Sequence, residues 1–140
     1  MRGLLRKDAK VELLKHVTLF SGCSKKELGQ IAQIADEIDF PAGKTLIRQG
    51  TPGRQFFVVI AGRLEVEQDG KKFPPRGGSE FFGEIALVSG WPATATVTTV
   101  EPTRALVIAP RQFRALLDQQ PSIQRRVLHS FSERLAPHVI

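Results

Sequence analysis

The chain has 140 residues, 41% of them hydrophobic and 24% charged, which is ordinary for a soluble globular protein and enough for one domain with a single core. No apolar run approaches the roughly 20 residues that span a bilayer, and the N-terminus is too polar for a signal peptide, so we expect a cytoplasmic protein with no membrane partner. Cys23 is the only cysteine, which excludes an internal disulfide.

The formal net charge of +6 raises nucleic acid as a partner. However, lysine and arginine are spread along the chain from Arg2 to Arg134 in short clusters, without a stripe that has interleaved aromatic residues. We interpret this distribution as a generally basic surface and do not favour nucleic acid as the partner.

Two helices are predicted in the first 36 residues. The spacing of Val11, Leu14 and Val17 indicates an amphipathic helix that ends before Leu19. Ser24 and Glu27 then have the spacing of a capping box, which begins the second helix.

From residue 37 the hydrophobic period changes to two, which is typical of strands. Asp69 and Gly70 predict a tight hairpin, because both central positions of such a turn need a positive φ. Short strands separated by glycine turns favour an antiparallel barrel or jelly roll. The predicted strands after residue 40 are 45–48, 56–61, 63–68, 94–100 and 104–109.

Two helices follow the predicted strands. Pro110 and Pro121 suit the first positions of helices, and apolar residues in steps of four give the last helix one hydrophobic face. That face comprises Ile123, Val127, Phe131 and Leu135. We therefore expect one α+β, mainly β domain with helices in residues 1–36, a β barrel in 37–109 and helices in 110–140.

The stretch of residues 78–97 has the pattern of an anion-binding loop that leads into a strand. Gly83 permits a sharp turn before a short helix predicted at residues 84–88, whose free N–H groups and dipole attract phosphate. Glu84 would repel phosphate but could accept hydrogen bonds from a hydroxyl-bearing part of the same ligand, such as a ribose. The alternative is a capped turn between strands, with Glu84 solvated.

Four segments in this order resemble the cyclic nucleotide-binding domain family, which includes catabolite activator proteins and regulatory subunits of cyclic AMP-dependent kinase. They are Phe40–Gly50, Phe56–Val66, Phe82–Leu87 and Ala95–Val97. The resemblance covers residues 19–135 and implies a double-stranded antiparallel β-helix, or jelly-roll barrel, with flanking helices. It also implies a regulatory sensor of cyclic AMP (cAMP) or cyclic GMP (cGMP), with no other cofactor.

The resemblance further implies a phosphate-binding cassette that begins at Gly83 and Glu84. In the family the glutamate accepts the ribose 2′-hydroxyl, and backbone donors near Ile85 and Ala86 meet the cyclic phosphate. The ligand-binding residues implied are Phe82, Gly83, Glu84, Ile85, Ala86, Ala93, Thr94 and Ala95.

Ala93 departs from the family's pattern, because it stands where an arginine normally grips the phosphate. Removing one partner of a buried charged pair costs roughly 3 to 5 kcal/mol, which is about two to three and a half orders of magnitude in affinity. Thr94 keeps a hydroxyl but brings no charge.

Five further residues are auxiliary candidates, each with a structural alternative. Arg54 and Arg76 could reach the phosphate or be solvated loop residues. Trp91 could stack on a ring or be a turn aromatic. Leu128 and Phe131 could cover the pocket from the last helix, although core packing explains their spacing equally well.

The chain ends about 20 residues after Pro121 without an output domain of its own. A sensor of this kind would signal through a separate effector protein or through self-association. One alternative is a degenerate cassette that binds no ligand or a different one and serves as a protein-interaction module.

An enzyme is the other alternative, and no catalytic residues support it. His16, His129 and His138 all lie in predicted helices or the tail, so they cannot converge on a metal inside the barrel as histidines do in cupins.

Overall fold

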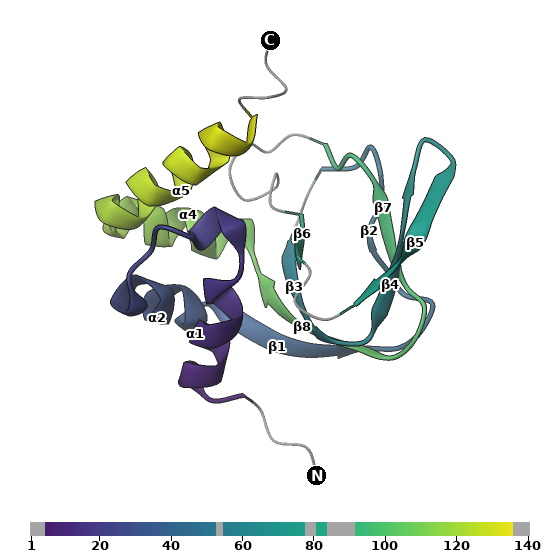
Figure 1. Ribbon diagram of the computed structural model, residues 1–140, viewed down its shortest axis with the longest axis horizontal. Coiled ribbons are helices and arrows are strands. Elements are labelled where there is room, and N and C mark those ends of the chain that lie inside the picture. The colour runs from purple at the N-terminus through teal and green to yellow at the C-terminus, as the bar shows by residue number, and fades with distance from the viewer. Residues whose placement is uncertain (1–4, 53–54, 78–80, 84–91, 136–140) are drawn as a thin grey trace.

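The computed structural model describes residues 5–52, 55–77, 81–83 and 92–135, and these residues form three layers (Figure 1). Helices form one outer layer, and two four-stranded antiparallel sheets form the other two. This arrangement confirms the predicted jelly roll with flanking helices, although the two sheets do not close into a barrel.

The first sheet has the strand order β1-β8-β3-β6 and the second has the order β2-β7-β4-β5. The strands are β1 (Ala35–Phe40), β2 (Thr45–Ile47), β3 (Phe56–Ala61), β4 (Arg63–Gln68), β5 (Lys71–Gly77), β6 (Phe81–Phe82), β7 (Thr96–Thr99) and β8 (Thr103–Ile108). The helices are α1 (Lys7–Lys15), the 3-10 helix η1 (Thr18–Phe20), α2 (Lys25–Gln33), α4 (Pro110–Gln119) and α5 (Pro121–Leu135). None of the described helices is long and apolar enough to cross a membrane.

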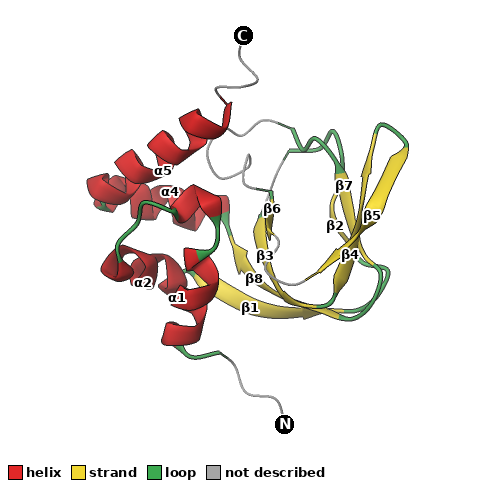
Figure 2. Cartoon of the chain, in the orientation of Figure 1, coloured by secondary structure: helices red, strands yellow, loops and turns green. Residues whose placement is uncertain are grey.

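The helices pack on the first sheet, on the side away from the second (Figure 2). The capping box predicted at the start of α2 is present, because Ser24 accepts from the N–H of Glu27 and Glu27 accepts from the N–H of Ser24. At the centre of this layer the ring of Phe20 lies 6.0 Å from that of Phe56 and 5.9 Å from that of Phe113. All three rings are fully buried, so the helices pack directly against β3.

Strand β3 is buried on both faces because it lies between the helices and the second sheet. Phe56 and Val58 belong to the helical core, whereas Val59, on the opposite face, packs with Leu64 and Val97 of the second sheet. This explains why residues 56–59 form a continuous apolar run rather than an alternating one.

The hairpin predicted at residues 69–70 is confirmed, with φ values of 53° at Asp69 and 80° at Gly70. Its second strand, β5, and the short strand β6 were not predicted. Strand β5 contains Pro74 and Pro75, which cannot donate to a ladder, and β6 has only two residues, too few for a periodic pattern.

Strand β1 differs from the sequence expectation in its start and in its buried face. It begins at Ala35, which pairs with Ile108, rather than at residue 37. Ile38 is 36% exposed, whereas the side chain of Glu37 is 2% exposed. The carboxylate of Glu37 accepts from the N–H of Leu5 at 2.7 Å and lies 2.7 Å from a guanidinium nitrogen of Arg104, so these partners compensate for its burial.

Candidate functional site

The backbone turns sharply at Gly83, directly after β6. Its φ is 89°, a left-handed conformation that side chains rarely adopt. A Cβ atom at this position would also lie 2.5 Å from the carbonyl oxygen of Gln55, closer than real Cβ contacts allow. Glycine is therefore required here for two independent reasons, and the sharp turn expected from the sequence is present.

Ala93 is held by its backbone on the other side of the undescribed residues 84–91. Its N–H donates to the carbonyl oxygen of Thr51 at 2.9 Å, and its own carbonyl accepts from the N–H of Gly50 at 2.8 Å. An isolated β-bridge between Pro52 and Pro92 extends this pairing. The connection between β2 and β3 thus contacts both ends of the cassette, through Thr51 near Ala93 and through Gln55 at Gly83.

The side chains at the C-terminal end of the cassette carry no charge. Ala93 and Ala95 are half-buried, and Thr94 is exposed. The hydroxyl of Thr96 accepts from the N–H of Gln49 at 2.9 Å, which fixes the start of β7 against the end of β2. The backbone of Ala93, where the resemblance implies that the family's arginine would stand, is therefore held by hydrogen bonds, and its side chain is only a methyl group.

An apolar cluster lies between the two sheets beside this turn. It joins Val59 and Phe82 of the first sheet to residues of the second, namely Leu46, Ile47, Leu64, Val66 and Val97. Apolar side chains of this kind offer a phosphate no partner, because an unpaired charge is costly among apolar groups. Any anion bound beside this turn would need donors from outside the cluster.

The remaining site residues predicted from the sequence are only partly visible. Arg76 lies on β5 opposite Leu64, and Phe131 lies on α5, but neither side chain is among those described. Outside the described residues lie Arg54, Glu84, Ile85, Ala86 and Trp91.

Helix α5 packs through Ile123 and Val127, both fully buried. Leu128 is 50% exposed, so the core-packing interpretation is wrong for this residue.

Cys23, the one cysteine of the chain, is a poor nucleophile. Burial, together with the nearby carboxylate of Glu27, raises the pKa of the Cys23 thiol to about 11, which keeps it protonated and weakly nucleophilic near neutral pH. His16 follows α1 and His129 lies on α5, so neither is on a strand. Within the described ranges, no group of three or more His, Cys, Asp and Glu residues is placed to hold a metal ion.

One buried polar cluster was missed by the sequence analysis. Glu27, in the capping box of α2, also accepts from the hydroxyl of Ser122 at 2.5 Å and pairs with Arg126 at 3.0 Å. It therefore joins α2 to α5. Glu27 and Ser122 are 95 residues apart in the chain, so no local sequence signal could have shown this contact.

Two antiparallel sheets in a jelly roll, with a left-handed glycine after β6 and helices on one face, define the class of fold to which the chain belongs. The chain belongs to the cyclic nucleotide-binding domain family, whose model matches residues 37–120.

Two curated relatives illustrate the range of this family. A CRP-like cAMP-activated global transcriptional regulator from Mycobacterium tuberculosis is 26% identical over 129 residues, with 89% of this chain and 58% of the relative covered. A cAMP-dependent protein kinase regulatory subunit from Dictyostelium discoideum is 26% identical over 132 residues, with 89% and 40% covered. This chain thus spans less than two thirds of either relative.

A solved structure supports the fold. The N-terminal domain of a transcriptional regulator from Streptomyces coelicolor superposes with a TM-score of 0.79 at 24% identity, covering 91% of this chain and 94% of that domain.

Proposed function

We propose that this domain is a regulatory sensor that binds a cyclic nucleotide, cAMP or cGMP, between its two sheets. The observation that carries the proposal is the clamping of both cassette ends by the β2–β3 connection. Gly83 turns against Gln55, and Ala93 pairs with Gly50 and Thr51. These backbone contacts fix the positions of Gly83 and Ala93, the two residues between which the phosphate donors are expected.

Between these two residues, Glu84 accepts the ribose 2′-hydroxyl, and the N–H groups of Ile85 and Ala86 donate to the cyclic phosphate. Membership of the family supports these roles. Because Ala93 brings no charge, the backbone donors and the hydroxyl of Thr94 bear most of the phosphate binding. The sensor is therefore expected to bind more weakly than a relative with arginine at this position, by about two to three and a half orders of magnitude.

Calorimetric titration with cAMP and with cGMP tests this proposal, and the Ala93→Arg variant sharpens it. An arginine on this fixed backbone should tighten binding at least about tenfold, because it restores a charge-assisted contact with the phosphate. Ala42→Arg is the matched control: it adds the same charge in an exposed turn before β2, whereas Ala93 lies at the other end of the β2–β7 pair. Equal affinities for Ala93→Arg and the unmodified protein would contradict the proposed phosphate position.

A degenerate cassette is the second candidate, in which the domain binds a different ligand or none and acts as a protein-interaction module. The half-buried methyl group of Ala93 favours it, because no cation replaces the arginine among the described side chains of residues 92–95. Under either function, a separate effector protein or a second copy of the chain would receive the signal.

A further inference from the structure

The fold separates the charges that the sequence spreads along the chain. Residues 5–34 and 110–135, which supply the helical layer, contain 11 lysines and arginines against 5 aspartates and glutamates. The described residues between 35 and 109, which supply the sheets and their connections, contain 7 against 7. The net positive charge of the protein therefore belongs to the helical layer, while the sheets are close to neutral.

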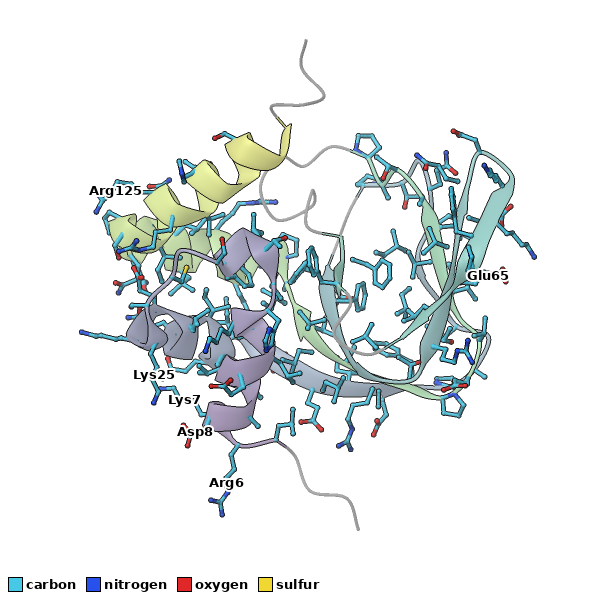
Figure 3. The ribbon with its side chains drawn as sticks, in the orientation of Figure 1. Arg6, Lys7, Asp8, Lys25, Glu65 and Arg125 are labelled. Carbon is cyan, nitrogen blue, oxygen red and sulfur yellow. The ribbon has the colours of Figure 1, made fainter. Side chains whose placement is uncertain are left out.

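Several of these cations share one part of the helical surface. The Cε atom of Lys7, on α1, lies 3.0 Å from the place a Cβ of Gly29 would take on α2. Lys25 is four residues before Gly29 and so projects from the same face of α2. Figure 3 shows Arg6, Lys7, Lys25 and Arg125 pointing outward from the helical layer, on the opposite side of the molecule from Glu65 on β4.

We call Arg6, Lys7, Lys25, Lys26 and Arg125 the basic helical face. All five are exposed, and none of them forms an ion pair with another described residue. In contrast, the neighbouring Arg126 is neutralised by Glu27. Lys25 and Lys26 are also the first two residues of α2, where the helix dipole disfavours positive charge. The isolated domain thus keeps a surface whose charges repel one another.

We propose that the basic helical face is a docking surface for an acidic segment of another protein. A second copy of this chain does not offer a complementary surface, because its sheets are nearly neutral and its helices are basic. Nucleic acid suits the face less well. The two aromatic side chains described in the helical layer, Phe20 and Phe113, are fully buried, so no described ring is exposed there for stacking.

The test measures fluorescence anisotropy of a labelled oligoglutamate peptide with the whole chain, in the absence of nucleotide, so its outcome is independent of the proposed function. We expect binding that weakens as salt is raised from about 50 mM to about 300 mM. Combining Lys7→Glu, Lys25→Glu and Arg125→Glu should weaken binding at least about tenfold. If this variant does not fold, the corresponding glutamine substitutions take its place, with a loss in the same direction.

The matched control combines Lys44→Glu, Arg63→Glu and Lys71→Glu, which make the same change in net charge on exposed residues of the second sheet and of the turn before β2. It should alter the affinity by less than about twofold, since these residues lie outside the basic helical face. Equal losses in the two triple variants would overturn the proposal. Tighter binding to duplex DNA or to phosphatidylserine vesicles than to oligoglutamate, at the same salt, would also overturn it.

Discussion

Glu27 has 7% of its surface exposed and stays charged because three groups meet it. The N–H of Ser24 and the hydroxyl of Ser122 donate to its carboxylate, and Arg126 supplies a positive charge. Burial raises the pKa of Glu27, but these hydrogen bonds and the guanidinium outweigh burial, so the net pKa lies below the ordinary value of 4.5. The ionised form is therefore the one that stabilises the fold.

Glu27→Gln should lower the free energy of unfolding at pH 7 by roughly 1.5 to 3 kcal/mol, because it removes charge-assisted bonds that join α2 to α5. Since the folded-state pKa is lowered, the contribution of Glu27 is complete above pH 4.5 and is lost as the pH falls further. The free energies of unfolding of Glu27→Gln and of the unmodified protein, measured in urea, should therefore become equal in acid.

Glu12→Gln is the control, because Glu12 is exposed on α1 and should change stability by less than about 0.5 kcal/mol. A gap between Glu27→Gln and the unmodified protein that persists unchanged at pH 3 would contradict the role assigned to the Glu27 charge.

For individual residues, the sequence predicts contacts between near neighbours in the chain and misses contacts between positions far apart in it. The spacing of Ser24 and Glu27 was sufficient for the capping box. Ser122 could not be assigned to Glu27, because the contact depends on how α5 packs. The inverted burial of Glu37 and Ile38 has the same origin, since Arg104 and Leu5 reach Glu37 only in the folded chain.

The β2–β3 connection is the element on which the candidate site depends. It pairs with Ala93 through Gly50 and Thr51 and places the carbonyl of Gln55 against Gly83. Any change that pushes these segments apart should disturb both ends of the cassette at once.

Gly83→Ala should destabilise the fold by roughly 2 to 4 kcal/mol and abolish nucleotide binding, because the added methyl group meets the carbonyl of Gln55 as well as an unfavourable φ. Gly43→Ala is the control that separates the contact with Gln55 from the cost of the left-handed φ. Gly43 has a φ of 82°, close to the 89° of Gly83, but a Cβ there would meet nothing within 4 Å.

Gly43→Ala should therefore cost only about 1 to 2 kcal/mol, the cost of the left-handed conformation alone, and should leave nucleotide affinity unchanged. Thermal unfolding and calorimetric titration measure the two effects. Equal destabilisation by the two variants would mean that the close approach of Gln55 to Gly83 does not matter.

Helices and strands with a clear sequence pattern could be predicted, and those without one could not. The strands at residues 56–61 and 63–68 were predicted with their observed bounds, because glycine turns and a dense apolar run mark their ends. The prolines of β5 and the brevity of β6 hid both strands. Cassette residues such as Gly83 and Glu84 were identified by family resemblance, since their spacing alone also fits a capped turn.

Across the whole molecule, the apolar core is divided unevenly by the first sheet. Among the described residues, 17 buried residues form the cluster on the helical side, whereas 3 form the cluster between the sheets. The helical side is therefore expected to supply most of the hydrophobic stability. The smaller cluster between the sheets is completed by partly buried side chains such as Ile47 and Phe82, which pack against it.

Binding of a cyclic nucleotide against the clamped cassette can be followed by an NMR titration of the amide resonances of Gly83 and Ala93. With cAMP or cGMP, both resonances should shift together with one submillimolar dissociation constant, while that of Gly43 stays in place. If neither resonance moves at several millimolar of either nucleotide, the domain is not a cyclic nucleotide sensor.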